Sequence, residues 1–563
     1  MHPSRFAGAV MLAGAVLLLG CTPGEKDAAN TNSRPAEAAS TEGAASTSQG
    51  AAVRSGTMAD AQKAKPGALF GGSQPQIGLA PAPQPAVMAP ENTEKYLPIE
   101  GNPVKEVAEA PVSTFSVDVD SGSYANIRRF LMGGQKPPKD AVRVEEMVNY
   151  FAYDYPAPDD RSVPFKTTTH VTRTPWNPDT YLLEIGIKGY RPDHEKRPPA
   201  NLVFLIDVSG SMDEPDKLPL LKAGMHLLVD QLRDDDKVSI VVYAGAAGVV
   251  LEPTSGADKA KIDAALDRLQ AGGSTAGGEG IQLAYAMAKQ ARVENGINRI
   301  ILATDGDFNV GVTDIGQLKG MIEDSRKSGI ALSTLGFGEG NYNDALMEQI
   351  ADVGNGNYGY VDSLKEAKRL LVDQLDATIE TIAKDVKVQI EFNPAVVAEY
   401  RLIGYENRAL AREDFNNDRK DAGEIGAGHT VTALYEIALK GSRGLAVDPL
   451  RYGTDRPAAS SLKADEFAFL RLRYKAPDGD QSRLIETPLL ADRLKQPESE
   501  RGDLDFAAAV AAFGQKLRGG DYLKGYSYDQ IAALARQTRG PDADGTRAEF
   551  IDLVELAKAL GDS

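Results

Sequence analysis

Cysteine is almost absent from this sequence: Cys21 is the single one among 563 residues. Because a disulfide needs two thiols, no bridge can form within the chain. An exported body would have to be held by its core, alone or together with a metal ion. Histidine is scarce too, with five residues. After Cys21 no apolar run reaches the length of about 20 residues that a membrane-spanning helix needs.

Basic residues are fewer than acidic ones. The chain has 62 Lys and Arg against 80 Asp and Glu, a formal net charge of -18. Nucleic acids and anionic lipid surfaces both attract basic proteins, so neither is expected to bind this chain through charge. The rest of the composition, 25% charged and 42% apolar, is ordinary for a globular protein. The length allows about two to four domains.

Residues 1–21 have the layout of a secretory signal. Met1–Arg5 carries positive charge, Phe6–Leu19 is apolar or small, and Gly20 and Cys21 follow. This ending resembles the bacterial lipobox, which implies that Cys21 is lipidated and becomes the mature N-terminus. Thr22, next in the chain, would then imply the outer membrane of a Gram-negative cell. An ordinary signal peptide or a short membrane anchor, with an incidental cysteine, is the alternative.

Residues 22–95 are expected to form a disordered tether. They are mostly Ala, Ser, Gly, Pro, Thr and Gln, and Phe70 is their only aromatic residue. Such a segment cannot bury enough apolar surface to offset the entropy lost on ordering. As a flexible coil it would span about 50 Å, which would hold a folded body clear of a lipid surface.

The stretch Asn201–Met212, NLVFLIDVSGSM, is the most informative in the chain. Its short, branched apolar run predicts a strand buried on both faces. Asp207, Ser209 and Ser211 follow at intervals of two residues, at the strand end where open parallel sheets bind ligands. These oxygens suit a hard cation such as Mg²⁺, and with no Cys or His nearby they do not suit zinc.

Two later segments offer further oxygens. Gly272–Gly278 is a glycine-rich loop that presents Thr275 before a helix, and Arg299–Gly306 is a second buried strand that ends in Asp305. Taken singly, each motif could be no more than a turn or a helix cap. Taken together and in this order, they resemble the metal-ion-dependent adhesion site of von Willebrand factor type A domains.

The resemblance implies one Mg²⁺, or Mn²⁺ or Ca²⁺, held by Asp207, Ser209, Ser211, Thr275 and Asp305. The hydroxyls would bind it directly, and the carboxylates partly through water. A vacant coordination position would accept an Asp or Glu carboxylate from a protein partner. A further DVDSGS segment at Asp118–Ser123 lacks the required aspartate spacing, and we interpret it as a strand-to-helix cap.

The predicted fold class is α/β, with a doubly wound, mostly parallel sheet. Strand and helix patterns alternate through residues 199–378, which favours right-handed crossovers between parallel strands. Alternating patterns before and after this domain predict a β-sandwich in which it is inserted or by which it is flanked. The flanking regions are an α+β domain at 96–198, a sandwich-like domain at 379–500 and a helical segment at 501–563.

The whole order resembles the bacterial von Willebrand type A lipoproteins of the YfbK-like family. The segments that carry the resemblance beyond the metal motif are FSVDVDSGSYANIRRF, EEMVNYFAYDYP and GEIGAGHTVTALYEI. It implies a protein anchored by lipid to the cell envelope that binds a protein partner through its metal site. The alternative is a scaffold for envelope assembly or signalling in which the metal is structural.

An enzyme is the least favoured interpretation, and we expect none. Ser274 lies in a GGSTA segment that approaches an esterase elbow but ends in alanine, and no phosphate-binding loop of the GxxxxGK[ST] type occurs. His429 is the one histidine in a suggestive context, and beside a glycine turn it is more typical of a structural residue. Neither nucleic acid nor a small-molecule cofactor is expected as a partner.

Overall fold

The computed structural model describes residues 92–561, except 161, 193–195, 274–276, 307–314, 449–464 and 496–500. The expected signal, Cys21 and nearly all of the expected tether therefore lie outside the described residues. Residues 86–563 form one compact unit. No helix in the described ranges is long and apolar enough to cross a membrane.

A six-stranded sheet forms the middle of the chain, in the order β10-β9-β8-β5-β6-β7. All neighbours pair in parallel except β7, which runs antiparallel to β6 at the edge. The strands are β5 (Ala200–Asp207), β6 (Lys237–Tyr243), β7 (Ala247–Ser255), β8 (Ile297–Thr304), β9 (Ala331–Phe337) and β10 (Tyr358–Val361). All eight residues of β5 are buried, as expected for a strand covered on both faces.

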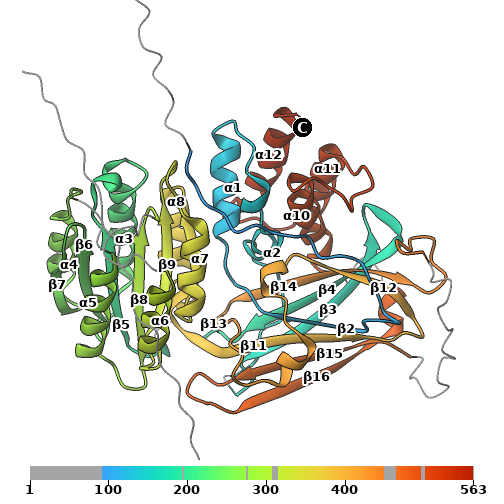
Figure 1. Cartoon of the computed structure of the whole chain (residues 1–563), viewed down its shortest axis with the longest axis horizontal. Coiled ribbons are helices and arrows are strands. Elements are labelled where there is room, and N and C mark those ends of the chain that lie inside the picture. The colour runs from blue at the N-terminus through green and yellow to red at the C-terminus, as the bar shows by residue number, and fades with distance from the viewer. Residues whose placement is uncertain are drawn as a thin grey trace, which may run out of the picture. The chain divides into compact units, whose positions relative to one another are not determined.

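Helices cover both faces of this sheet (Figure 1). Phe204 and Ile206 of β5 belong to the core on one face, whereas Val203 and Leu205 belong to the core on the other, because side chains alternate along a strand. The helices are α3 (Leu218–Gln231), α4 (Lys259–Asp267), α5 (Gly277–Gln290), α6 (Ile315–Arg326), α7 (Asp344–Val353), α8 (Leu364–Lys368) and α9 (Leu375–Ile379). The predicted doubly wound α/β fold is confirmed.

Two antiparallel sheets form a sandwich from strands on either side of this domain in the sequence. One has the order β1-β12-β14-β4-β3, and the other is β13-β11-β15-β16 with β2 paired to β11. The strands are β1 (Lys105–Glu106), β2 (Val112–Ser116), β3 (Phe165–Thr174), β4 (Asn177–Gly189), β11 (Thr381–Phe392), β12 (Val397–Ile403), β13 (Ile425–Gly426), β14 (Thr430–Leu439), β15 (Glu466–Lys475) and β16 (Ser482–Leu490).

The pairing of these strands makes the α/β domain an insertion. Leu183 and Ile185 of β4 face Val388 and Ile390 of β11 within one apolar core, although the α/β domain separates these strands in the chain. Since β4 pairs with β14 and β2 with β11, neither sheet is complete without both halves of the sequence.

Helices from both ends of the described chain share a further core. Phe151, Phe506 and Phe550 meet edge to face, with ring centroids 5.2 to 5.7 Å apart. The C-terminal helices therefore pack with the N-terminal ones. The helices are α1 (Gly122–Met132), α2 (Val144–Asn149), α10 (Leu504–Leu517), α11 (Tyr528–Thr538) and α12 (Thr546–Ala559).

Buried arginines join these helices to the α/β domain. Arg143 donates to Asp344 at 2.6 Å, and Arg128 donates to Asp362 and Glu366 at 2.5 and 2.9 Å. All of these side chains are almost fully buried. Because removing one partner of such a pair leaves a buried charge uncompensated, these contacts fix the mutual placement of the elements they join.

Candidate metal centre

The carboxyl ends of β5 and β8 bring Asp207 and Asp305 to one edge of the central sheet. The two strands are direct parallel neighbours, with Ile206 opposite Ala303. Asp207 is the last residue of β5, and Asp305 follows the last residue of β8. Both carboxylates are fully buried. The sequence predicted a site at the carboxyl-terminal edge of the sheet, and Asp207 and Asp305 both lie at that edge.

Two hydrogen bonds hold the Asp207 carboxylate in place. Its Oδ1 accepts from the backbone N–H of Ser209 at 2.9 Å, and its Oδ2 accepts from the Thr304 hydroxyl at 2.9 Å. Burial, with a smaller contribution from the nearby Asp305, raises the pKa of Asp207 to about 6. A bound cation would relieve this unfavourable burial of like charges.

Ser209 and Ser211 lie side by side after β5, around a single 3-10 turn at Gly210–Asp213. Their hydroxyl oxygens are 3.1 Å apart, and Ser209 is buried while Ser211 is half-buried. Adjacent oxygens on an octahedral Mg²⁺, each about 2.1 Å from the ion, lie about 3.0 Å apart. The spacing of the two hydroxyls therefore fits neighbouring positions on such an ion.

Thr275 lies outside the described residues, but Gly272 and Gly273, which precede it, are held by backbone hydrogen bonds. Gly272 donates its N–H to the Val208 carbonyl at 2.7 Å, and Gly210 donates its N–H to the Gly273 carbonyl at 3.1 Å. Helix α5 then begins at Gly277. The start of the glycine-rich loop is thus hydrogen-bonded to the loop that carries Ser209 and Ser211.

Lys217 is a component of the site that the sequence analysis missed. Its ammonium lies 3.1 Å from Asp305 Oδ2 and 3.3 Å from the Asn341 side-chain oxygen, and Asn341 donates to Asp305 Oδ2 at 3.1 Å. Lys217 is almost fully buried. Its side chain crosses Gly338, where φ is +73° and a Cβ would overlap the lysine carbons. Lys217 is a single lysine before a helix, and no sequence pattern around it predicts this contact.

The donor set fits a hard cation better than a soft one. Among the described residues, no group of three or more His, Cys, Asp and Glu side chains is placed to hold a metal ion. The predicted set instead combines two carboxylates with hydroxyls, which suits Mg²⁺ and its retained waters. Asp207, Ser209, Ser211 and Asp305 are the described residues that would hold it.

The DVDSGS segment at Asp118–Ser123 is a structural turn. Asp118 and Asp120 accept hydrogen bonds from Arg408 at 3.1 and 3.4 Å. Ser121 precedes α1, but its side chain makes no capping hydrogen bond, so the predicted cap is wrong. The hydroxyl accepts from Arg369 at 2.7 Å instead. The backbone N–H of Ser123, at the start of α1, donates to the Glu146 carboxylate at 2.7 Å, so Glu146 rather than Ser121 caps this helix end.

Of the two groups considered for enzymatic chemistry, His429 lies within the described residues. Burial lowers the pKa of His429 to about 3, and its ring nitrogen accepts from the Gly426 N–H at 3.3 Å. That is the behaviour of a neutral structural histidine, as the sequence indicated. Ser274 lies outside the described residues.

Three family models match the chain. One described as "von Willebrand factor type A domain" matches residues 201–374, "Uncharacterized protein YfbK, C-terminal" matches 377–560, and "von Willebrand factor" matches 90–184. The central sheet with its helices is thus a von Willebrand factor type A domain, and it defines the class of the protein.

The chain belongs to the YfbK family. It is 49% identical to the Escherichia coli "Uncharacterized protein YfbK" over 481 residues, which cover 84% of this chain and 83% of that protein. A Synechocystis relative, "Uncharacterized protein sll0103", is 33% identical over 33% of this chain and 43% of its own length. Membership of this class indicates a protein-interaction or adhesion role.

Solved structures of related architecture include a von Willebrand factor type A protein from Catenulispora acidiphila. It has 18% identity and a TM-score of 0.38, and the match covers 69% of this chain and 89% of that one. The ArnB paralog VWA2 from Sulfolobus acidocaldarius has 15% identity and a TM-score of 0.33, over 71% and 98% of the two chains.

Proposed function

We propose that this protein is anchored to the bacterial cell envelope through lipidated Cys21 and captures a protein partner at the metal centre. In this proposal the partner contributes an Asp or Glu carboxylate. A bound Mg²⁺ would supply the positive charge that recognises that group. The anchor would be in the outer membrane, with residues 22–91 between it and the described body.

The observation that supports this proposal most strongly is the convergence of four side chains at one edge of the sheet: Asp207, Ser209, Ser211 and Asp305. The hydroxyls are neutral, so the protein would contribute only two formal negative charges to a divalent ion. An ion bound by hydroxyls and waters keeps its attraction for an outside carboxylate. Thr304 and the Ser209 N–H hold Asp207 in a fixed orientation, so little rearrangement would be needed on binding.

A capture experiment tests this proposal. The full-length protein would be used to pull partners from detergent-solubilised membranes in Mg²⁺ and in EDTA, with captured proteins identified by mass spectrometry. Ser209→Ala removes one hydroxyl ligand without adding charge, and we expect it to lose the partner that EDTA also releases. The partner should be retained less well when free acetate or a carboxylate-bearing peptide competes.

Ser239→Ala is the matched control for this substitution. Ser239 is a buried serine in β6 of the same sheet, and its hydroxyl has no hydrogen-bond partner among the described residues. It should capture the partner as the wild type does. Capture that continues unchanged in EDTA would refute the proposal. A fall in melting temperature with EDTA, together with no carboxylate competition, would favour the scaffold with a structural metal.

A further inference from the structure

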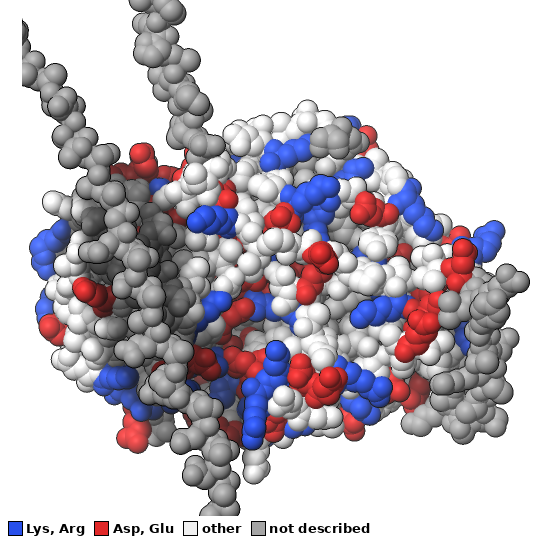
Figure 2. All heavy atoms as spheres, in the orientation of Figure 1, with Lys and Arg blue, Asp and Glu red and all other residues white. Residues whose placement is uncertain are grey.

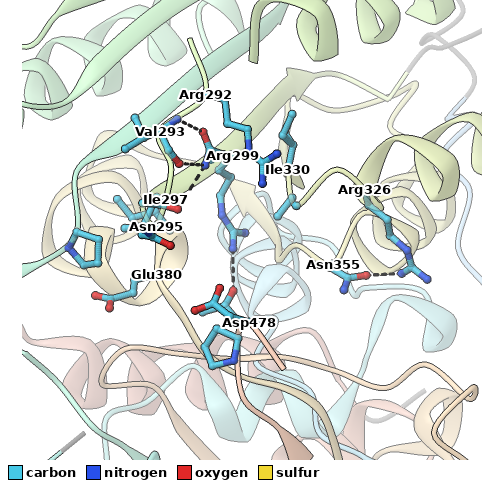
Figure 3. Close-up of a pocket in the computed structure, with 18 of the residues that line it drawn as sticks. Arg292, Val293, Asn295, Ile297, Arg299, Arg326, Ile330, Asn355, Glu380 and Asp478 are labelled. Carbon is cyan, nitrogen blue, oxygen red and sulfur yellow. Dashed lines mark hydrogen bonds between the residues drawn. The ribbon is translucent and has the colours of Figure 1, made fainter. Parts of the chain in front are cut away.

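A second cavity lies at the opposite end of the central sheet from the metal centre. It has a volume of about 430 Å³ and is lined by the segment Arg292–Arg299, where β8 begins, by the start of β9, and by Glu380, Glu424 and Asp478 of the sandwich side. Figure 3 shows the Arg299 side chain pointing into this space. Arg299 and Asp305 are six residues apart along β8, so the cavity and the metal centre are about 20 Å apart.

Arg299 is a buried cation that forms no ion pair with a described residue, although the charge of Glu424 acts on it from a distance. Its guanidinium is fully buried and donates only to neutral oxygens: the Ser333 hydroxyl at 2.6 Å, the Asn357 amide at 3.4 Å and the Thr381 hydroxyl at 3.2 Å. No carboxylate of the described residues pairs with it, and its Nε has no hydrogen-bond partner among them. Burying a charge without pairing is unfavourable, so an acceptor at Nε would be stabilising.

Basic and acidic side chains both line the cavity around Arg299, with Arg292, Arg326 and Lys384 on one side of the balance and Glu294, Glu380, Glu424 and Asp478 on the other. Arg292 and Lys384 also line the cavity, and neither forms an ion pair with a described residue. Arg326, by contrast, is neutralised by Asp421 at 2.6 Å. Burial, reinforced by Asp421 and Asp385, raises the pKa of Glu424 well above its usual range, and its Oε1 has no hydrogen-bond partner among the described residues.

The desolvation of Arg299 is strong enough to change its basicity. Burial lowers the pKa of its guanidinium to about 10, which still leaves it charged at neutral pH. Neutral hydroxyl and amide oxygens hold two of its nitrogens in a fixed plane, so the group is oriented before any ligand arrives. A planar, oriented guanidinium is the side chain best suited to bind a carboxylate or a phosphate.

We propose that this cavity is a binding site for a small organic oxyanion, a carboxylate or a phosphate ester, that accepts a hydrogen bond from Arg299 Nε. Lys384 and Arg292 would add charge from the rim, and the unpartnered Glu424 oxygen would contact the ligand's polar part. The volume greatly exceeds the roughly 30 Å³ that one water occupies and lies within the range of ligand pockets. Val293, Ile330 and Pro477 provide apolar walls for an organic remainder.

Binding is tested with two probes, inorganic phosphate and citrate, against full-length protein at matched ionic strength in chloride. Isothermal titration calorimetry gives the affinity, and the melting temperature gives an independent readout. The wild type should show saturable binding of one equivalent of one of the probes. The choice between them distinguishes a phosphate ligand from a carboxylate ligand.

Three variants locate the site. Arg299→Gln removes the charge and Nε, and should weaken binding at least about tenfold, as expected for loss of a charge-assisted hydrogen bond. Ala331→Phe fills the cavity from the start of β9 and leaves Arg299 intact, so it tests the same site if Arg299→Gln fails to fold. Arg268→Gln makes the same charge change at an exposed arginine of the α/β domain and should bind like the wild type.

Loss of binding in Arg299→Gln or Ala331→Phe, with retention in Arg268→Gln, supports the proposal. No saturable binding of either probe overturns it. Equal binding in the wild type and Ala331→Phe also overturns it, because the probe would then sit elsewhere. Arg299 would in that case have a structural role only, connecting β8 to β11 through hydrogen bonds to its three neutral acceptors.

Discussion

At the scale of single residues, the metal centre contains a cation of its own. Lys217 places its ammonium 3.1 Å from Asp305 Oδ2 in a buried setting. A divalent ion that used the same carboxylate would have to share it with this ammonium or displace it. Lys217 is therefore expected to weaken metal binding, because its ammonium and the metal ion would repel each other at short range.

Replacing Lys217 with methionine tests that expectation. Methionine keeps the unbranched shape that fits over Gly338 but removes the charge. We predict that the dissociation constant for Mg²⁺, measured by calorimetry, falls by about three- to tenfold, the usual scale for removing one nearby like charge. Lys222→Met is the control, because Lys222 lies in the helix that begins just after Lys217 and bonds only backbone carbonyls of the described chain. Unchanged or weaker binding in Lys217→Met would contradict the prediction.

Glu145 gives a prediction for stability against pH. Burial first, and then the charge of Glu406, raises the pKa of Glu145 from its ordinary value near 4.5 to about 8. The folded state therefore holds this proton more tightly than the unfolded state. The contribution of this raised pKa to the free energy of unfolding is fully present below about pH 4.5. It is lost as the pH rises through 8.

Glutamine at position 145 cannot titrate, so Glu145→Gln should flatten this pH dependence. We expect its free energy of unfolding to fall less between pH 5 and pH 8 than that of the wild type, by about 1 kcal/mol or more. Urea denaturation at the two pH values measures the difference. Glu413→Gln, at an exposed position, should behave like the wild type. Identical pH profiles for Glu145→Gln and the wild type would show that Glu145 is already ionised in the folded protein.

At the scale of elements, the loop between β9 and α7 contacts the metal centre on one side and the end of the expected tether on the other. Asn341 bonds Asp305, while Gly340 exchanges hydrogen bonds with Thr93 and Glu94 at 2.8 and 2.9 Å. Glu94 in turn pairs with Arg129 at 2.9 Å. The sequence analysis assigned residues through 95 to the tether, but the structure shows residues 93–95 bound to this loop.

Weakening this contact should loosen the loop. Glu94→Gln removes the charge that pairs with Arg129 and accepts from the Gly340 N–H. We predict that the amide of Gly340 exchanges with solvent at least about tenfold faster in hydrogen-exchange mass spectrometry, as expected for losing a charge-assisted hydrogen bond. Glu252→Gln, at an exposed position on β7, is the control. Equal exchange in the two variants would mean that Glu94 does not hold the loop.

The sequence predicted elements well where periodicity and strand ends carried the signal. The apolar run of β5 and the alternation of strands and helices led to the α/β domain, and Asp207 and Asp305 were found because each follows such a strand. Lys217 and the docking of residues 93–95 were missed because both depend on how the loop at 338–343 folds back. The cap expected in the segment Asp118–Ser123 was wrong because Arg369 binds the Ser121 hydroxyl, and Arg408 binds Asp118 and Asp120, from segments far away in the chain.

At the scale of the whole molecule, the sandwich and the α/β domain are parts of one folded unit. The sheets combine strands from both halves of the sequence, and Arg128 and Arg143 join the helices to the α/β domain through buried ion pairs. On the face seen in Figure 2, basic and acidic side chains are interspersed rather than gathered by sign.

Calorimetric titration of the full-length protein with Mg²⁺ tests the central claim most directly. Wild type and Ser239→Ala should each bind one ion, and Ser209→Ala should bind at least about tenfold more weakly, because a hydroxyl ligand is gone while the charge is unchanged. Equal Mg²⁺ binding by Ser209→Ala and the wild type, or none by the wild type, would contradict a metal centre at this edge of the sheet.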